Sequence, residues 1–470
     1  MSDPTWISVL PPILAIALAI WTRQVYLSLA GGLWFAWTIM EGWDPLGGLG
    51  QSVEGMVSVF GQAGDARVIM FTLAIGALIA TVEASGGVRG FVNLLEQNRW
   101  VDSAKKAQLL AWATGIVIFI ESNITVLVAG SVSRPLFDRY KCSREKLAYI
   151  IDSTSAPICI LIPMNAWGAY NLGILEGLEV EDALGVFLQS ILYNFYAVVA
   201  VILVLVVIVM GLDVGPMKKA EERTRGGQLL WPDATPMIDE EVLSPTPLDG
   251  VEPRARNMFF PIASMVFFMP LSLWITGDGD LSAGSGSTSV LWSVMFGLAV
   301  AWIMLRAQGI FTVEQLTKIN LRGAGALVPL AMILLLALAL GDVVDALGTG
   351  VYVAQVTAGT MPNFLYLPLV FLVSGGIAFS TGTSWGTFAI MLPIAVPAAA
   401  TLSLPLAPFV AASLAGGVFG DHCSPISDTT IISSMAAATD HIDHVRTQLP
   451  YALLSGAIAM ICFGVLGATL

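Results

Sequence analysis

The sequence predicts an all-α polytopic membrane protein built from two inverted repeats, each with five transmembrane helices and one re-entrant hairpin, and with broken helices at the membrane midplane. Of the 470 residues, 56% are hydrophobic and 12% are charged, whereas soluble domains carry about 25% charged residues. Many apolar stretches reach the ~20 residues that a membrane-spanning helix needs. Basic residues also gather in particular loops, and the net charge of −13 argues against a nucleic-acid partner.

Ten apolar segments are predicted to cross the lipid bilayer as helices. The polar segment between the second and third of them, which carries Asp44, Glu54 and Asp65, is predicted to be an outer loop. The ten spans are residues 5–21, 24–40, 66–86, 146–178, 186–212, 257–276, 288–305, 324–341, 406–438 and 447–469.

Two further apolar segments, 107–138 and 364–400, are too long for one span and are predicted to be re-entrant hairpins. Lysines and arginines flank the first segment on both sides, which places both of its ends in the cytoplasm and its tip near Glu121-Ser122-Asn123. The second segment has uncharged flanks, which fits entry from the opposite face with a tip at residues 381–384. Ordinary tilted spans are the alternative, but they would put the basic loop 213–256 outside.

These assignments divide the chain into a first repeat (1–212), a cytoplasmic linker (213–256) and a second repeat (257–470). The broken helices are 146–178 and 406–438. Each repeat crosses the bilayer an odd number of times, so the second is inverted relative to the first. Both termini are then extracytoplasmic, in a bacterial inner membrane. The linker contains six prolines and no apolar periodicity, so it is expected to be partly disordered.

Polar residues cluster where the apolar segments are interrupted, at 121–124, 152–157, 381–386 and 420–430. Carboxylates inside a membrane cost about 2.5–3.5 kcal/mol on insertion scales and usually have a function. Together with hydroxyls and amides they offer the hard oxygen donors that Na⁺ binds, and a buried carboxylate can exchange a cation for a proton. The expected cation- or substrate-binding residues are Asp421, Asp428, Ser424, Asp152, Ser153, Thr154, Ser122, Asn123, Thr383 and Ser384, and the proton-coupling candidates are Asp421, Asp428, Asp152, Glu121 and His422.

Several of these side chains also have a purely structural interpretation. A serine or threonine in a span often bonds back to its own helix, and His422 could simply bond to backbone. His441 and His444 are expected in a solvated inner loop. Trp167 and Trp385 lie near breaks in opposite halves, where they could face an organic cation or pack in the interior.

The stretch Gly420-Asp-His-Cys-Ser-Pro-Ile-Ser-Asp-Thr-Thr-Ile431, followed by Asp443-His-Val-Arg-Thr-Gln-Leu-Pro-Tyr-Ala452, resembles the signature of the NhaC family of Na⁺/H⁺ antiporters. The resemblance implies membership of the ion transporter superfamily, and a homodimer in which a transport domain moves past a scaffold. It also implies that Asp421, Ser424 and Asp428, which lie in the matching motif, are functional residues. Dicarboxylate–sodium symporters of that superfamily have Ser-Asn-Thr at their hairpin tips, from which Ser122-Asn123-Ile124 departs.

The expected function is therefore Na⁺/H⁺ antiport, in which buried carboxylates exchange Na⁺ for protons by an elevator-type movement. The alternative is a Na⁺- or H⁺-coupled transporter or exchanger of a small organic solute, either a malate- or lactate-like acid or an amine. Room between Trp167 and Trp385 would favour the solute, and a compact oxygen-lined site would favour the ion. No cofactor is expected besides Na⁺ as transported or coupling ion. An enzyme is not expected, because the neighbours Asp421, His422 and Ser424 lack the geometry of a triad.

Overall fold

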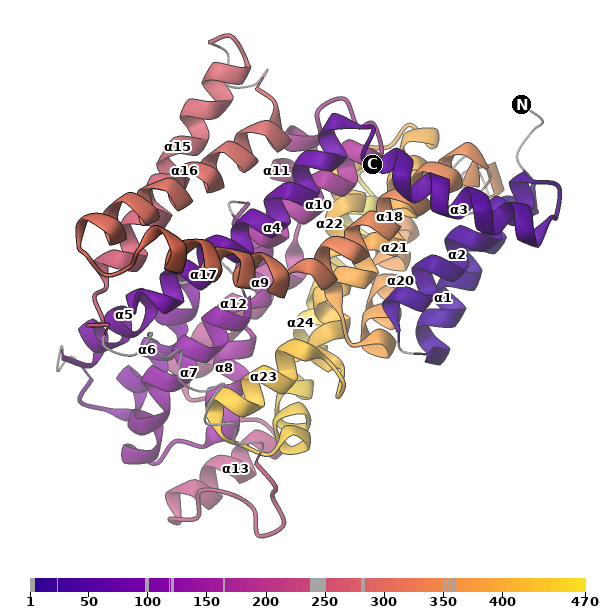
Figure 1. Cartoon of the computed structure of the whole chain (residues 1–470). Coiled ribbons are helices and arrows are strands. Elements are labelled where there is room, and N and C mark those ends of the chain that lie inside the picture. Colours follow the sequence, from indigo (N-terminus) through magenta and orange to yellow (C-terminus); the bar gives the residue numbers. More distant parts are fainter. Residues whose placement is uncertain are drawn as a thin grey trace.

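A computed structural model describes residues 5–470 except 23, 98–100, 118, 120–121, 164, 237–250, 280–283, 350–351, 353–354 and 357–360. The regular elements of this described part are helices (Figure 1). Seven of them are long and apolar enough to cross a membrane, or nine if two bent pairs are counted as single spans. Large apolar side chains such as Trp21, Phe267 and Ile303 face outward, as lipid contact requires. The chain is a multi-pass membrane protein.

The first half runs from the N-terminal helix to the start of the linker. Its helices are α1 (Leu10–Thr22), α2 (Val25–Met40), α3 (Pro45–Val59), α4 (Ala63–Ala84), α5 (Gly87–Gln97), α6 (Ala104–Val117), α7 (Ser122–Arg139), α8 (Arg144–Asp152), α9 (Ala156–Leu161), α10 (Ala166–Gly177), α11 (Ala183–Leu192) and α12 (Phe195–Met210). The linker contains α13 (Pro216–Arg225), and the second half contains α15 (Arg256–Thr276), α16 (Gly286–Ala307), α17 (Val313–Ala326), α18 (Val328–Ala346), α20 (Tyr366–Thr381), α21 (Ser384–Thr401), α22 (Leu406–Cys423), α23 (Asp428–Ala437) and α24 (His441–Gly467).

Both halves present these helices in the same order. Helices α1 to α4 of the first half correspond in order to α15 to α18 of the second. The pair α6–α7 then corresponds to α20–α21, the broken helix α8–α10 to α22–α23, and the closing helix α12 to α24. The contacts between the halves are reciprocal, because α17 packs on α4 while its counterpart α3 packs on α18. This order supports an internal repeat. The inverted orientation of the second half stays a prediction.

The connection between the second and third predicted spans contains a helix, α3, that was not predicted, and its outer location stays a prediction. Asp44 caps this helix by accepting a hydrogen bond from the backbone N–H of Leu46, and Pro45 occupies its first turn, where a missing N–H costs nothing. The predicted span 324–341 begins too early. Its first residues belong to the end of α17, and the following helix α18 is bent by 46° relative to α17.

The paired helices turn at or beside the predicted tips. Helices α6 and α7 pack against each other, and α20 and α21 meet at Gly382, whose φ of 68° lies in the left-handed region. A Cβ on Gly382 would also lie 2.4 Å from the carbonyl oxygen of Ile426, so only glycine fits this turn. Each arm of the second pair is long enough to cross a membrane by itself. The re-entrant path therefore stays a prediction for both pairs.

The first half is interrupted where it was predicted, because α8 ends at Asp152 and α9 begins at Ala156. Residues 153–155 form the turn between them, and Pro157 sits in the first turn of α9, where it is tolerated. A second and sharper bend, of 51°, separates α9 from α10. It follows from Pro163, which disfavours helical backbone at the preceding residue, and Ile162 is extended accordingly (φ −111°, ψ 114°).

The break in the second half lies where it was predicted, between α22 and α23. Ser424 precedes Pro425 and is extended (φ −83°, ψ 128°), as the proline requires. Ser427 then restarts the helix by accepting a hydrogen bond from the backbone N–H of Thr430.

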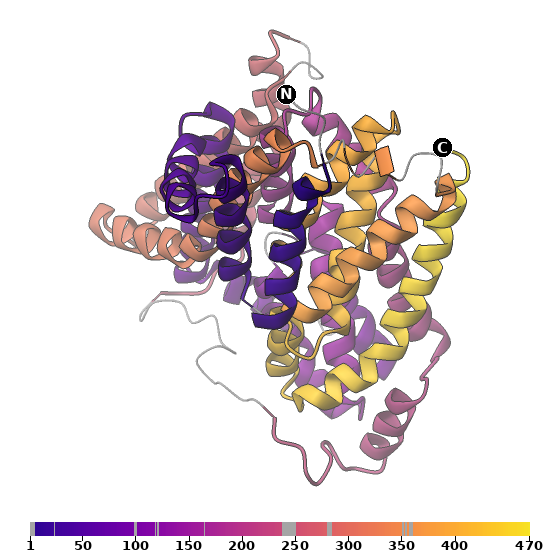
Figure 2. The same ribbon diagram turned by 90° about the vertical axis from the view of Figure 1, so that its right-hand side faces the viewer.

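The first part of the linker forms a helix, which is compatible with the expectation of a partly disordered segment. Helix α13 packs against α8 and α24. Arg223 donates two hydrogen bonds to Glu145, at 2.7 and 2.9 Å, and Lys146 pairs with Asp213 at 2.7 Å. The C-terminus and α13 lie at opposite ends of the molecule (Figures 1 and 2). Residues 237–250 of the linker lie outside the described part.

We predict that Glu145→Gln destabilises the protein. Both side chains of the Glu145–Arg223 pair are at most 4% exposed, and leaving one partner of such a pair unpaired costs about 3–5 kcal/mol. The thermal unfolding midpoint of the detergent-solubilised protein should fall markedly. The control Glu314→Gln breaks the exposed pair with Lys318 and should barely change the midpoint. Equal midpoints for the two variants would contradict a stabilising role for α13.

Candidate cation-binding site

A glycine contact between α20 and α22 positions the centre of the site. A Cβ on Gly420 would lie 2.1 Å from the carbonyl oxygen of Gly375, and one on Gly416 would lie 2.3 Å from that of Phe371. The two backbones therefore touch, as small residues allow in membrane helices. This contact holds the last turn of α22, with Asp421, beside the turn that joins α20 to α21.

Asp421 is completely buried. Its Oδ2 accepts a hydrogen bond from Thr429 Oγ1 at 3.2 Å, and the hydroxyls of Ser384 and Ser427 lie close to the carboxylate. Its Oδ1 is buried and makes no hydrogen bond of ordinary length with the described residues. An unpaired buried oxygen is costly, so this centre is suited to take up a cation or a proton.

Ser424 and Asp428, at the same break, differ from Asp421 in their surroundings. The Ser424 hydroxyl is buried and donates to the carbonyl oxygen of Phe379 at 2.7 Å, so it ties the break to α20. Asp428 is exposed, contrary to the expectation of a buried carboxylate. It opens α23, where the N-terminal end of the helix favours negative charge. It still lies close enough to Asp421 to interact with it electrostatically.

Asp152 lies in a second buried centre, within electrostatic range of Asp421. Its Oδ1 accepts a hydrogen bond from Ser433 at 3.0 Å, and its Oδ2 accepts one from Gln448. His444 Nε2 lies 3.6 Å from Oδ2. Helix α8 of the first half and helices α23 and α24 of the second half thus assemble this centre together.

The histidines are placed differently from expectation. His444 is completely buried, so the prediction of a solvated loop is wrong for it, and His441 bonds to Ser434 and to the carbonyl of Pro425. His422 is also buried, and its Nδ1 lies 3.0 Å from the hydroxyl of Tyr196. It therefore has a side-chain partner, and its Nε2 has none among the described residues.

The remaining predicted donors are brought together only in part. Thr154 donates to the carbonyl of Ile150 at 2.7 Å, within its own helix, so it offers no free hydroxyl hydrogen. Ser153 and Ser122 are buried, and Thr383 caps α21 without a side-chain hydrogen bond. Glu121 and the side chain of Asn123 lie outside the described residues.

Trp167 and Trp385 pack against each other. Their ring centroids are 4.7 Å apart, and Trp167 is completely buried. Tyr170 contacts Trp385 edge-on and donates to its backbone carbonyl at 3.0 Å. The cluster joins α10 to α21 and leaves no room for a solute between the two indoles.

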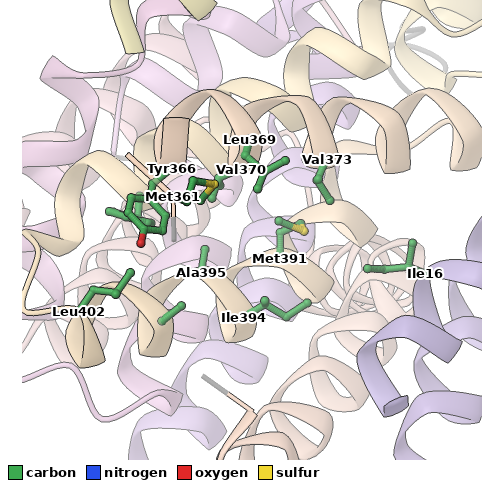
Figure 3. Close-up of a pocket in the computed structure, with 12 residues that line it drawn as sticks. Ile16, Met361, Tyr366, Leu369, Val370, Val373, Met391, Ile394, Ala395 and Leu402 are labelled. Carbon is green, nitrogen blue, oxygen red and sulfur yellow. The ribbon is translucent and has the colours of Figure 1, made fainter. Parts of the chain in front are cut away.

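An apolar cavity of about 180 Å³ lies between α20 and α21 (Figure 3). Tyr366 and Val370 line one side and Met391 and Ile394 the other, while Ile16 of α1 borders it. Apolar walls cannot replace the hydration shell of an ion. This cavity is therefore not the cation site.

Sequence reasoning missed Tyr196, Ser433 and Gln448 as contributors, and it placed His444 in a solvated loop. A signal existed for three of these four residues. Thr429 and Ser433, and likewise His444 and Gln448, are four residues apart and share one face of a helix. Thr429 contacts Asp421 and Ser433 contacts Asp152. His444 and Gln448 both face Asp152.

The family model that matches residues 158–468 is the Na⁺/H⁺ antiporter family. The chain belongs to this family. This antiporter is 33% identical to an uncharacterized protein of Haemophilus influenzae over all of its own length and 92% of the relative. It is 29% identical to the arginine/ornithine antiporter ArcD of Halobacterium salinarum, over 47% of this chain and 45% of that one. A malate-2H⁺/Na⁺-lactate antiporter of Bacillus subtilis is 32% identical over 24% of this chain and 26% of its own.

Solved structures share the fold of the antiporter. The crystal structure of the Alcanivorax borkumensis YdaH transporter superposes with a TM-score of 0.57 and 14% identity, over 97% of this chain and 98% of that chain. The fold is thus one found in transporters, and the family membership makes the protein a secondary transporter.

We predict that Gly420→Ala abolishes transport in a folded protein. The added methyl group would collide with the backbone of Gly375 and push α22 away from α20, which displaces Asp421. The control is Gly376→Ala on α20, where a Cβ would meet no atom within 4 Å. Transport in proteoliposomes and elution on size-exclusion chromatography measure both effects. Normal transport by Gly420→Ala would contradict the role of the glycine contact.

Proposed function

We propose that this antiporter exchanges Na⁺ for protons, and that Asp421 holds the cation. The observation that carries the proposal is the fully buried carboxylate with one unpaired oxygen, surrounded by hydroxyls of Ser384, Ser427 and Thr429. Oxygen donors with a negative charge suit Na⁺.

The charges around Asp421 favour a cation over an anion. None of the ion pairs formed by the described residues involves Asp421. A carboxylate or phosphate substrate would ordinarily be recognised by arginine or lysine. A proton and Na⁺ instead oppose each other's binding in this negatively charged interior, so that binding of one releases the other. Such competition is sufficient for exchange.

The packing of Trp167 against Trp385, at 4.7 Å, also supports an ion. A solute held between the indoles would need them apart. The second candidate remains a small organic solute coupled to Na⁺ or H⁺, because similar proteins are named an arginine/ornithine antiporter and a malate-2H⁺/Na⁺-lactate antiporter. Asp421 would then hold the coupling ion or the amino group of an amine.

We further propose that the pairs α6–α7 and α20–α21 move with the broken helices past a scaffold, in an elevator-type transition of a homodimer. The α20–α21 turn supports this, because it contacts the break after α22 through Gly382 and Ser424. The proposed setting is a bacterial inner membrane with the basic linker in the cytoplasm. The position of α13 opposite the C-terminus (Figure 1) supports opposite sides for these two segments.

The test is Na⁺-driven proton flux in proteoliposomes that contain a pH-sensitive dye. We expect wild-type protein to give a flux and Asp421→Asn to abolish it, because the amide carries no charge and exchanges no proton. Asp428→Asn should weaken the flux. Asp278→Asn, at an exposed turn, is the matched control and should behave as wild type.

Two results would contradict the proposal. Wild-type protein that moves no protons with Na⁺, but moves them with malate, lactate or arginine, would favour the organic solute. Full Na⁺-driven flux by folded Asp421→Asn would place the cation elsewhere.

A further inference from the structure

His444 is a buried side chain whose chemistry the cation site leaves unused. It is completely buried in the first turns of α24, and neither ring nitrogen has a hydrogen-bond partner among the described residues. Roughly 90% or more of buried polar groups are hydrogen-bonded, so two unpaired nitrogens on one ring are unusual. The Nε2 atom faces Asp152 Oδ2 at 3.6 Å, just beyond hydrogen-bond distance.

Asp152 is a buried carboxylate that needs a positive partner. Its two hydrogen-bond donors, Ser433 and Gln448, are neutral. Among the described residues, Asp152 forms an ion pair with His444, and this pair exists only when His444 is protonated. A proton on His444 would therefore turn a near-contact into a charge-assisted hydrogen bond. Gln448, one turn further along α24, also donates to the carbonyl of His422 at 3.0 Å and fixes the geometry of the centre.

We propose that Asp152 and His444 form a proton-binding site that is separate from the cation site at Asp421. The proposal rests on the proposed Na⁺/H⁺ exchange. A proton bound between Nε2 and Oδ2 makes the centre less negative and weakens cation binding at Asp421 through space. By linkage, a cation at Asp421 weakens proton binding at Asp152 and His444 by the same factor. The proton thus need not occupy the oxygens that hold the cation.

Water comes within one helical turn of this centre. Thr447 donates to the backbone carbonyl of His444 at 2.9 Å, and it also lines a polar surface cavity of about 490 Å³ between α13 and α24. Lys219 and Asp443 line the same cavity. The cavity therefore reaches to within one helical turn of His444.

Other ionisable groups lie on the elements that pack around His444. They are Tyr149 and Asp152 on α8, Tyr196 on α12, Glu221 and Arg223 on α13, Asp421 and His422 on α22, Asp428 on α23, and His441, Asp443, Arg446 and Tyr451 on α24.

Transport assays separate the two sites. We expect His444→Gln to lose Na⁺ uptake driven by a pH gradient but to keep Na⁺–Na⁺ exchange, measured with ²²Na⁺ on both sides and no gradient. Asp421→Asn should lose both activities. His441→Gln is the matched control, since His441 bonds to Ser434 and Pro425 and does not contact Asp152. Uptake by His444→Gln that responds to pH as in wild type would overturn the proposal, as would loss of both activities in folded protein.

A direct measurement works even if His444→Gln fails to fold or Na⁺ is not the substrate. The chain has three histidines, so wild-type protein labelled with ¹⁵N-histidine should give three sets of imidazole signals, with His441→Gln assigning one set. We expect one buried histidine to become doubly protonated as the pH is lowered, and to stay neutral at the same pH in Asp152→Asn. Buried histidines that stay neutral throughout the pH range of transport, or that titrate identically in Asp152→Asn, would overturn the proton site. Failure of Na⁺ transport alone would overturn only the Na⁺/H⁺ exchange.

Discussion

Two carboxylates, Asp421 and Asp152, lie in the interior of a membrane protein, and much of the fold serves to keep them there. Buried charge is tolerated only with partners. The partners here are neutral hydroxyls and an amide: Thr429 in the first turn of α23, Ser384 at the start of α21, and Gln448 in the first half of α24. Because these donors are neutral, each carboxylate keeps a charge that a mobile cation or proton can satisfy.

The two halves of the chain build this interior jointly. Asp152 comes from the first half, but its donors Ser433 and Gln448 come from the second. Tyr196 of the first half contacts His422 of the second. The Asp152 centre therefore depends on the relative position of the halves, whereas the hydroxyls around Asp421 all come from the second half. A rearrangement of one half against the other would change the partners of a carboxylate directly, without any intermediate chain of contacts.

The sequence predicts the features that depend on local chemistry. Apolar length locates most of the helices, Gly382 marks the turn between α20 and α21, and Pro425 marks the second break. Other features depend on tertiary contacts that no local pattern reveals. Helix α3 was missed because its many glycines and polar residues resemble a loop. The bend between α9 and α10 was missed because Pro157 and Pro163 look alike in sequence, and only the latter follows an extended residue. His444 looks solvated beside Asp440 and Asp443, yet its helical face turns inward.

The backbone contact at Gly416 and Gly420 has a mechanical consequence. Small residues at 416 and 420 let the backbone of α22 touch that of α20, and the ring of Phe419 stacks on Phe371 beside this contact. A movement that separated the two helices would have to give up both contacts. The cavity bordered by Ile16 differs, because its apolar walls form few hydrogen bonds (Figure 3).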